Sequence, residues 1–196
     1  GAGRTPHNPR VSSGLGVIPR VVSGSRAIYR GKLALAEAEA RIAGYWHPYH
    51  RALREMIETT HAQFGQALLI DCHSMPHEAI EGHLRPGQIR PDVVLGDRFG
   101  AAAAPAIMAE IEAAFTAAGL RVARNTPFAG AFVAQSYGRP SAGRHVVQVE
   151  IDRAIYMDEA RIEPLPRFDA FRHLMAGVIA RIAAIARPDE RALAAE

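Results

Sequence analysis

Apolar residues recur at helical spacing in three segments of the chain. A stripe at three- and four-residue spacing predicts a helix over Leu33–Phe64. Pro48 interrupts this stripe and predicts either a kink or a new start with Pro48 in the first turn. Gly65 ends the segment, and the same spacing predicts helices over Ala104–Ala118 and Phe168–Ala186.

Shorter apolar runs between these helices predict strands. The runs are Ala67–Asp71, Asp92–Leu95 and Leu120–Ala123. His145–Ile151 alternates, which places Val146, Gln148 and Glu150 on one face of a strand. Between the first two runs, Cys72–Arg90 predicts a loop long enough to be functional. The alternation of strand, helix and strand predicts an α/β fold with a mixed, mostly parallel sheet flanked by helices.

Composition limits the classes of partner. Apolar residues make up 48% and charged residues 22% of the chain, which is typical of a globular protein. The net charge is +3, the arginines are scattered and Lys32 is the single lysine, so we expect no nucleic-acid partner. No apolar run approaches the roughly 20 residues of a membrane span. A single cysteine, Cys72, excludes an internal disulfide and favours a cytoplasmic protein. The sequence does not indicate the oligomeric state.

The amino-terminal part has a different composition. Gly1–Arg30 is rich in Gly, Pro, Ser and Arg, has no helical period and contains one extended piece, Gly16–Val22. Gly1–Arg10 lacks the apolar segment of a secretory leader. Thirty such residues are atypical of the start of a compact domain. We therefore expect residues 1–196 to form a single domain that lacks its amino-terminal part.

Two side chains stand where ligands bind in open α/β sheets, at the carboxyl ends of strands. His73 follows the predicted strand Ala67–Asp71, and imidazole is the commonest protein ligand of zinc. The alternative is a loop histidine bonded to the backbone. Glu150 lies near the end of a second strand, where its carboxylate can face a cleft. The alternative is an acid that is paired with Arg153.

Other polar residues are candidates for substrate binding. Arg139, Arg144 and Arg153 could each grip a carboxylate, because guanidinium offers a bidentate fork. His47 and His50 are three positions apart on one predicted helix face, but Pro48 between them distorts that turn. A polar or substrate-side role for His50 and a purely structural one remain equally open.

Five short motifs occur in order along the chain. They are Trp46-His-Pro-Tyr-His50, Asp71-Cys-His-Ser-Met75, Pro91-Asp-Val-Val-Leu-Gly-Asp97, Asn125-Thr-Pro-Phe-Ala-Gly130 and Gln148-Val-Glu-Ile-Asp-Arg153. Together they resemble the N-formylglutamate amidohydrolase family, zinc-dependent hydrolases distantly similar to the zinc carboxypeptidases. The resemblance covers most of the chain between Gly14 and Glu159, and it implies a fold like that of the zinc carboxypeptidases.

The resemblance also implies an activity and a site. The reaction is hydrolysis of N-formyl-L-glutamate to formate and L-glutamate, a step in histidine degradation, with one zinc ion as cofactor. It implies that His73 ligates zinc, that Glu150 is the catalytic base and then acid, and that Arg153 lies at the substrate. Asp152 stands where the family leads us to expect an amide. The family's first metal motif, a Pro-His-Ser-Gly element with an acidic partner, is not in these residues. We therefore expect this chain alone to bind zinc poorly and to turn over little substrate.

Two alternatives remain beside this assignment. In one, the zinc site is kept and the substrate is another N-acyl amino acid or a small peptide. In the other, the chain keeps the fold but has lost catalysis, and it binds an acidic ligand or serves as a structural subunit. The missing first metal motif supports the second alternative.

Overall fold

The computed structural model describes residues 12, 14, 16–22, 25–84, 87 and 89–185, which form two compact units, Gly1–Leu53 and Arg54–Glu196. Gly1–Arg10 and Ala186, on which two sequence predictions bear, lie outside the described residues. The helices are α2 (Leu35–Arg41), α3 (His47–Phe64), α4 (Pro105–Ala117), α5 (Phe132–Tyr137) and α6 (Phe168–Ile185). The strands are β1 (Ala67–Met75), β2 (Val93–Gly96), β3 (Val122–Arg124), β4 (Arg144–Asp152), β5 (Met157–Asp158) and β6 (Glu163–Pro164). Short segments of other helix types span Ile42–Trp46 (π) and His77–His83, Pro140–Ala142 and Arg153–Ile155 (3-10).

The predicted first helix is confirmed and begins two residues later, at Leu35. Its α-helical geometry passes through the π turn and restarts at His47, which places Pro48 in the first turn of α3 as predicted. Gly65, at φ +73°, ends α3 in the conformation that glycine adopts most readily. The extended piece over Gly16–Val22 is reduced to one isolated bridge, from Val21 to Ala27.

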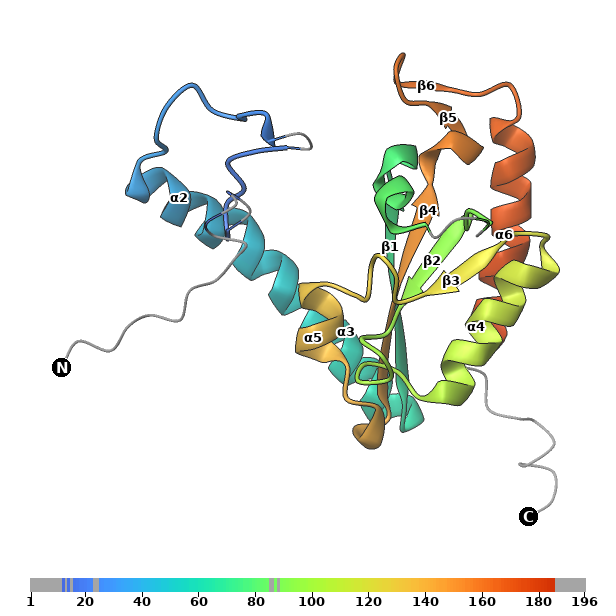
Figure 1. Cartoon of the computed structure of the whole chain (residues 1–196). Helices are drawn as coiled ribbons and strands as arrows, with labels where there is room; N and C mark the ends of the chain where they lie inside the picture. The colour runs from blue at the N-terminus through green and yellow to red at the C-terminus, as the bar shows by residue number, and fades with distance from the viewer. Residues whose placement is uncertain are drawn as a thin grey trace. The chain divides into compact units, whose positions relative to one another are not determined.

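The sheet of the second unit has the strand order β1-β4-β2-β3 (Figure 1). Strands β1 and β4 are parallel, β2 and β3 are parallel, and β2 and β4 are antiparallel. The predicted α/β fold with a mixed, mostly parallel sheet is therefore confirmed, and β2, α4 and β3 form the expected βαβ unit. That residues 1–196 make one domain stays a prediction.

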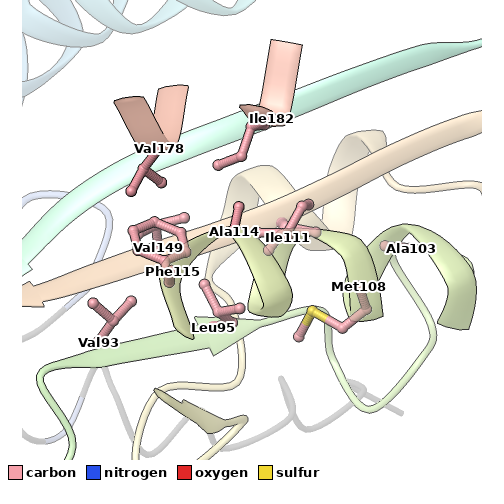
Figure 2. Packing of buried hydrophobic residues seen from close by; sticks show 11 residues of the cluster. Val93, Leu95, Ala103, Met108, Ile111, Ala114, Phe115, Val149, Val178 and Ile182 are labelled. Carbon is pink, nitrogen blue, oxygen red and sulfur yellow. The ribbon is translucent and has the colours of Figure 1, made fainter. Parts of the chain in front are cut away.

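One face of this sheet packs against α4 and α6 (Figure 1). Alternate residues of β2 and β4 point into this layer, and Figure 2 shows them meeting the apolar sides of the two helices. The buried cluster consists of Val93, Leu95, Ala103, Met108, Ile111, Ala114, Phe115, Val147, Val149, Val178 and Ile182. The site lies elsewhere, because residues between the core-facing ones on β4 point to the opposite face.

The stretch after Asp71 differs from the prediction. Strand β1 continues to Met75, and a 3-10 helix over His77–His83 replaces much of the expected loop. The reason is that β1 is an edge strand whose last part carries polar side chains, which break the apolar pattern without breaking the ladder with β4. None of the helices in the described part of the chain combines the length and apolarity needed to cross a membrane.

Candidate active site

A row of polar side chains crosses the sheet face opposite the α4–α6 layer. On β1 it contains Asp71 and His73; on β4 it contains Gln148 and Glu150. Paired residues of neighbouring strands point to the same side, and the ladder pairs Asp71 with Gln148 and His73 with Glu150. The register places His73 and Glu150 side by side on neighbouring strands, although they are far apart in sequence. That the two side chains open into one cleft stays a prediction.

His73 is held by a carboxylate. Its Nε2 lies 3.0 Å from Oδ1 of Asp71, and its side chain is 46% exposed. The structure thus replaces the alternative of a backbone-bonded loop histidine with an imidazole–carboxylate pair inside a strand. The second oxygen of Asp71, Oδ2, is buried and has no hydrogen-bond partner among the described residues. Such a pairing fixes the ring orientation and leaves Nδ1 as the nitrogen for a second ligand.

Glu150 is a buried carboxylate, only 9% exposed, in the middle of this row. Burial raises the pKa of Glu150 above its ordinary value, and the charge of Asp71 raises it further. The charges of His73 and Arg153 and a hydrogen bond from Gln148 lower this pKa but do not cancel the rise. Nε2 of Gln148 donates to Oε1 of Glu150 at 3.0 Å. A carboxylate whose neutral form is favoured in this way is suited to take up and release a proton near working pH.

The candidate arginines fall at opposite ends of β4. Arg153 follows the strand directly and donates from Nε to Oγ of Ser74 and from Nη2 to its carbonyl oxygen, both at 3.2 Å. Arg144 opens β4 opposite Ala67, six positions before Glu150, or about 20 Å away at roughly 3.3 Å per residue. Arg139 bridges to Arg144 at that far end. The structure therefore places Arg153 at the same end of β4 as Glu150 and leaves Arg144 and Arg139 at the other end.

His50 belongs to the other compact unit. It lies in α3, is 7% exposed, and its ring stands 4.3 Å from the ring of Trp46 and 5.0 Å from that of Tyr49, centroid to centroid. These contacts describe a packed aromatic cluster. A substrate-side role for His50 stays a prediction.

A family model described as N-formylglutamate amidohydrolase matches residues 3–157, which is most of the chain and all of the polar row. The chain belongs to the N-formylglutamate amidohydrolase family. It is 38% identical over 147 residues to an N-formylglutamate deformylase of Pseudomonas aeruginosa, covering 74% of this chain and 54% of that protein. A second N-formylglutamate deformylase, from Pseudomonas putida, is 31% identical over the same shares. The chain thus spans about half the length of the curated relatives it matches.

Two solved structures resemble the fold. A crystal structure of N-formylglutamate amidohydrolase from Ralstonia eutropha superposes with a TM-score of 0.81 at 33% identity, over 94% of this chain and 66% of that one. A gene product of Agrobacterium tumefaciens is 17% identical, with a TM-score of 0.54 over 86% of this chain and 63% of its own. The second likeness shows the fold alone.

Beyond the residues expected from the family resemblance, the structure adds a second imidazole–carboxylate pair. Nδ1 of His77 lies 2.6 Å from Oδ2 of Asp152, which is 3% exposed. The other oxygen of Asp152 accepts from the amide of Ala154 at 2.9 Å and so caps the turn that follows β4. The sequence indicated the position of Asp152, because the alternation of β4 that places Gln148 and Glu150 on one face continues to Asp152. His77 carried no such signal, because only the tertiary fold brings it to β4.

A loop of the family motif Asn125–Gly130 crosses the sheet next to this row. Its backbone passes over Gly96, where a Cβ atom would lie 2.6 Å from the carbonyl carbon of Ala129. At the start of the loop, Asn125 has φ +59°, and its Oδ1 accepts from the amide of Asp97 at 3.0 Å. At the end, the amide of Ala131 donates to Oε1 of Gln148 at 2.7 Å. The loop is therefore fixed at both ends and needs a glycine beneath it.

Replacing Gly96 with alanine is expected to destabilise the protein by about 1–3 kcal/mol, because the added methyl group overlaps the backbone of Ala129 and forces the loop outward. Urea unfolding followed by circular dichroism measures the change. Gly82→Ala is the control, since no atom lies within 4 Å of the position of its Cβ. Equal unfolding midpoints for the two variants would show that the loop accommodates the methyl group freely.

The metal chemistry of the family can be compared with the donors present. In the described part of the chain, no group of three or more His, Cys, Asp and Glu side chains is arranged to hold a metal ion. His73 nevertheless fits the role of one ligand, because Asp71 engages Nε2 as outer carboxylates do for metal-bound histidines. The buried Oδ2 of Asp71 has no hydrogen-bond partner among the described residues, so one oxygen of this carboxylate is left unsatisfied.

Proposed function

We propose that this chain carries the catalytic residues of a zinc-dependent amidohydrolase that cleaves N-formyl-L-glutamate to formate and L-glutamate. The observation that carries the proposal is the pairing of His73 with Glu150 on adjacent parallel strands, in a chain that belongs to this family. It is supported by relatives named N-formylglutamate deformylase. A role in histidine degradation and a cytoplasmic location belong to the same proposal. The first rests on the family resemblance, and the second rests on the single cysteine, Cys72.

In this proposal His73 would be one ligand of a single zinc ion, and Asp71, which engages Nε2, would keep the ring in the required orientation. When bound, zinc supplies a Lewis acid that lowers the pKa of water and polarises the formyl carbonyl. Asp71 increases the basicity of the imidazole and disfavours rotation of the ring.

Glu150 moves the proton. Its carboxylate accepts a proton from the water whose oxygen attacks the formyl carbon, and then delivers that proton to the amide nitrogen as the carbon–nitrogen bond breaks. The products are formate and the free amino group of glutamate. Burial serves both steps, because the raised pKa of Glu150 brings the acid and base forms closer in energy.

Arg153 is the arginine that fits a contact with a carboxylate of the substrate. It lies at the same end of β4 as Glu150 and already donates to Ser74, so its guanidinium is oriented before substrate binds. Arg144 is too far along the strand to share this task.

The test is zinc-dependent release of formate from N-formyl-L-glutamate with zinc in excess. It is run on the purified chain alone and on the chain joined to an upstream segment that supplies the Pro-His-Ser-Gly element and its acidic partner, because the chain alone is expected to bind zinc poorly. We expect His73→Ala to lower the turnover at least 100-fold and to reduce the zinc affinity measured by calorimetry, because loss of an inner ligand costs at least as much as loss of an outer one. His173→Ala, on the exposed side of α6, is the control.

The outcomes separate the alternatives. Turnover that His73→Ala leaves unchanged would overturn the proposal. Hydrolysis of N-acetyl-L-glutamate or a dipeptide in preference to the formyl compound would assign the site to another N-acyl substrate. Zinc binding without hydrolysis of any of them would assign the chain to a non-catalytic relative.

A further inference from the structure

Gln148 lies between the loop and the proposed catalytic carboxylate. Its side chain is 4% exposed and makes two hydrogen bonds in opposite directions. Oε1 accepts from the backbone amide of Ala131 at 2.7 Å, and Nε2 donates to Oε1 of Glu150 at 3.0 Å. A single carboxamide therefore links the loop to the carboxylate.

The chemistry of these two contacts requires a carboxamide. The amide of Ala131 can only donate, so it must meet an acceptor, and this orients the other end of Gln148 as a donor toward Glu150. A glutamate at position 148 would offer acceptors to both partners and repel the carboxylate. A methionine of similar length would offer neither a strong donor nor a strong acceptor.

The surroundings hold this link in place. Gly96, the β2 partner of Gln148, has no side chain and lets the loop backbone approach the sheet. The carbonyl oxygen of Ala129 accepts from the amide of Arg98 at 2.6 Å, which fixes the loop two residues before Ala131. The loop is fixed at Ala129, and the side chain of Gln148 is buried. A movement of the loop at Ala131 would therefore shift Gln148 and, through it, the carboxylate of Glu150.

We propose that Gln148 is a positioning residue that couples the Asn125–Ala131 loop to the orientation of the Glu150 carboxylate. This inference rests on the proposed function, in which Glu150 transfers the proton. It assigns the loop a role in turnover through a hydrogen-bonded link and does not require the loop to touch the reacting atoms.

Two substitutions separate the two hydrogen bonds. Gln148→Glu keeps an acceptor for Ala131 but removes the donor to Glu150, whereas Gln148→Met removes both. We expect Gln148→Glu to lower kcat about 10–100-fold with KM within threefold and to leave amide exchange at Ala131 slow. Gln148→Met is expected to lower kcat by a similar factor and to accelerate exchange at Ala131 at least tenfold.

The control is Val146→Ala, which removes buried side-chain atoms two positions earlier on the same face of β4. It should cost stability and leave kcat within threefold. A purely structural role for Gln148 would predict that kcat follows stability across all three variants, and that result would overturn the proposal. So would unchanged kcat in Gln148→Glu.

A second readout does not depend on activity. The side-chain amide protons of Gln148, observed by NMR, should shift and exchange faster in Glu150→Ala than in the wild type. Absence of formate release by the wild type, both alone and joined to the upstream segment, would overturn the proposed function. The link would then be judged from this spectrum alone: a shift would support it, and unchanged amide signals would overturn it.

Discussion

Glu150→Gln is expected to lower kcat for formate release by about 10²–10⁴-fold while the fold is retained. The substitution keeps the size of the side chain and replaces the carboxylate with an amide, which cannot take up the proton from water. Steady-state kinetics with N-formyl-L-glutamate and circular dichroism measure the two quantities. Glu163→Gln, on the exposed strand β6, is the matched control and should leave kcat unchanged. Undiminished turnover by Glu150→Gln would remove Glu150 from the proton-transfer step.

The same substitution should raise stability in the metal-free protein. Burial raises the pKa of the Glu150 carboxyl, so the folded state binds this proton more tightly than the unfolded chain does. Ionisation therefore costs stability, and the cost grows as pH rises from about 4 through the folded-state pKa and is constant above it. We expect Glu150→Gln to be more stable than the wild type at pH 7 and to match it below about pH 4. A variant that is less stable than the wild type at pH 7 would contradict this.

Phe115→Ala is expected to destabilise the protein by about 3–5 kcal/mol, the largest stability effect of any change considered. The Phe115 side chain is 1% exposed and lies between the sheet and α6, in the centre of the cluster in Figure 2. Its removal leaves a cavity that neither helix can close without disturbing the other. Since domains are stable by only about 5–15 kcal/mol, the variant should unfold at much lower urea concentrations.

Phe64→Ala serves as the control for Phe115→Ala. Phe64 is 54% exposed at the end of α3, so its truncation should change the free energy of unfolding by less than about 0.5 kcal/mol. Urea unfolding followed by far-ultraviolet circular dichroism measures the free energy of unfolding of both variants. Similar midpoints for the two would show that the α4–α6 layer contributes little to stability.

The sequence predicted the elements well where one local pattern decides the structure. The helical spacing of α6 and the alternation of β4 each arise from a face that must be buried, so both appear in the residues themselves. Periodicity did not predict how far such a face is covered. In the predicted α3 stripe, Leu53 and Ile57 are buried, whereas Tyr49 and Met56 are 54% and 60% exposed.

The site was predicted in part. The alternation placed Gln148 beside Glu150, and the family motifs drew attention to His73, but the parallel register that joins them depends on contacts between distant segments. The hydrogen bond from Ala131 to Gln148 depends on a loop path that no local pattern encodes. Arg144 is a different case. The sequence alone places it six strand positions before Glu150, and the rise per residue of a strand makes that distance too long for both residues to contact one small substrate.

Strand β1 has a consequence for handling the protein in solution. Among the described residues it forms its ladder with β4 only, which leaves one side of a nine-residue strand with backbone donors and acceptors that can pair with another chain. Leu68 and Ile70 are only partly buried on this strand. Open, partly apolar edges template strand addition, so we expect edge-to-edge aggregation to increase with the protein concentration.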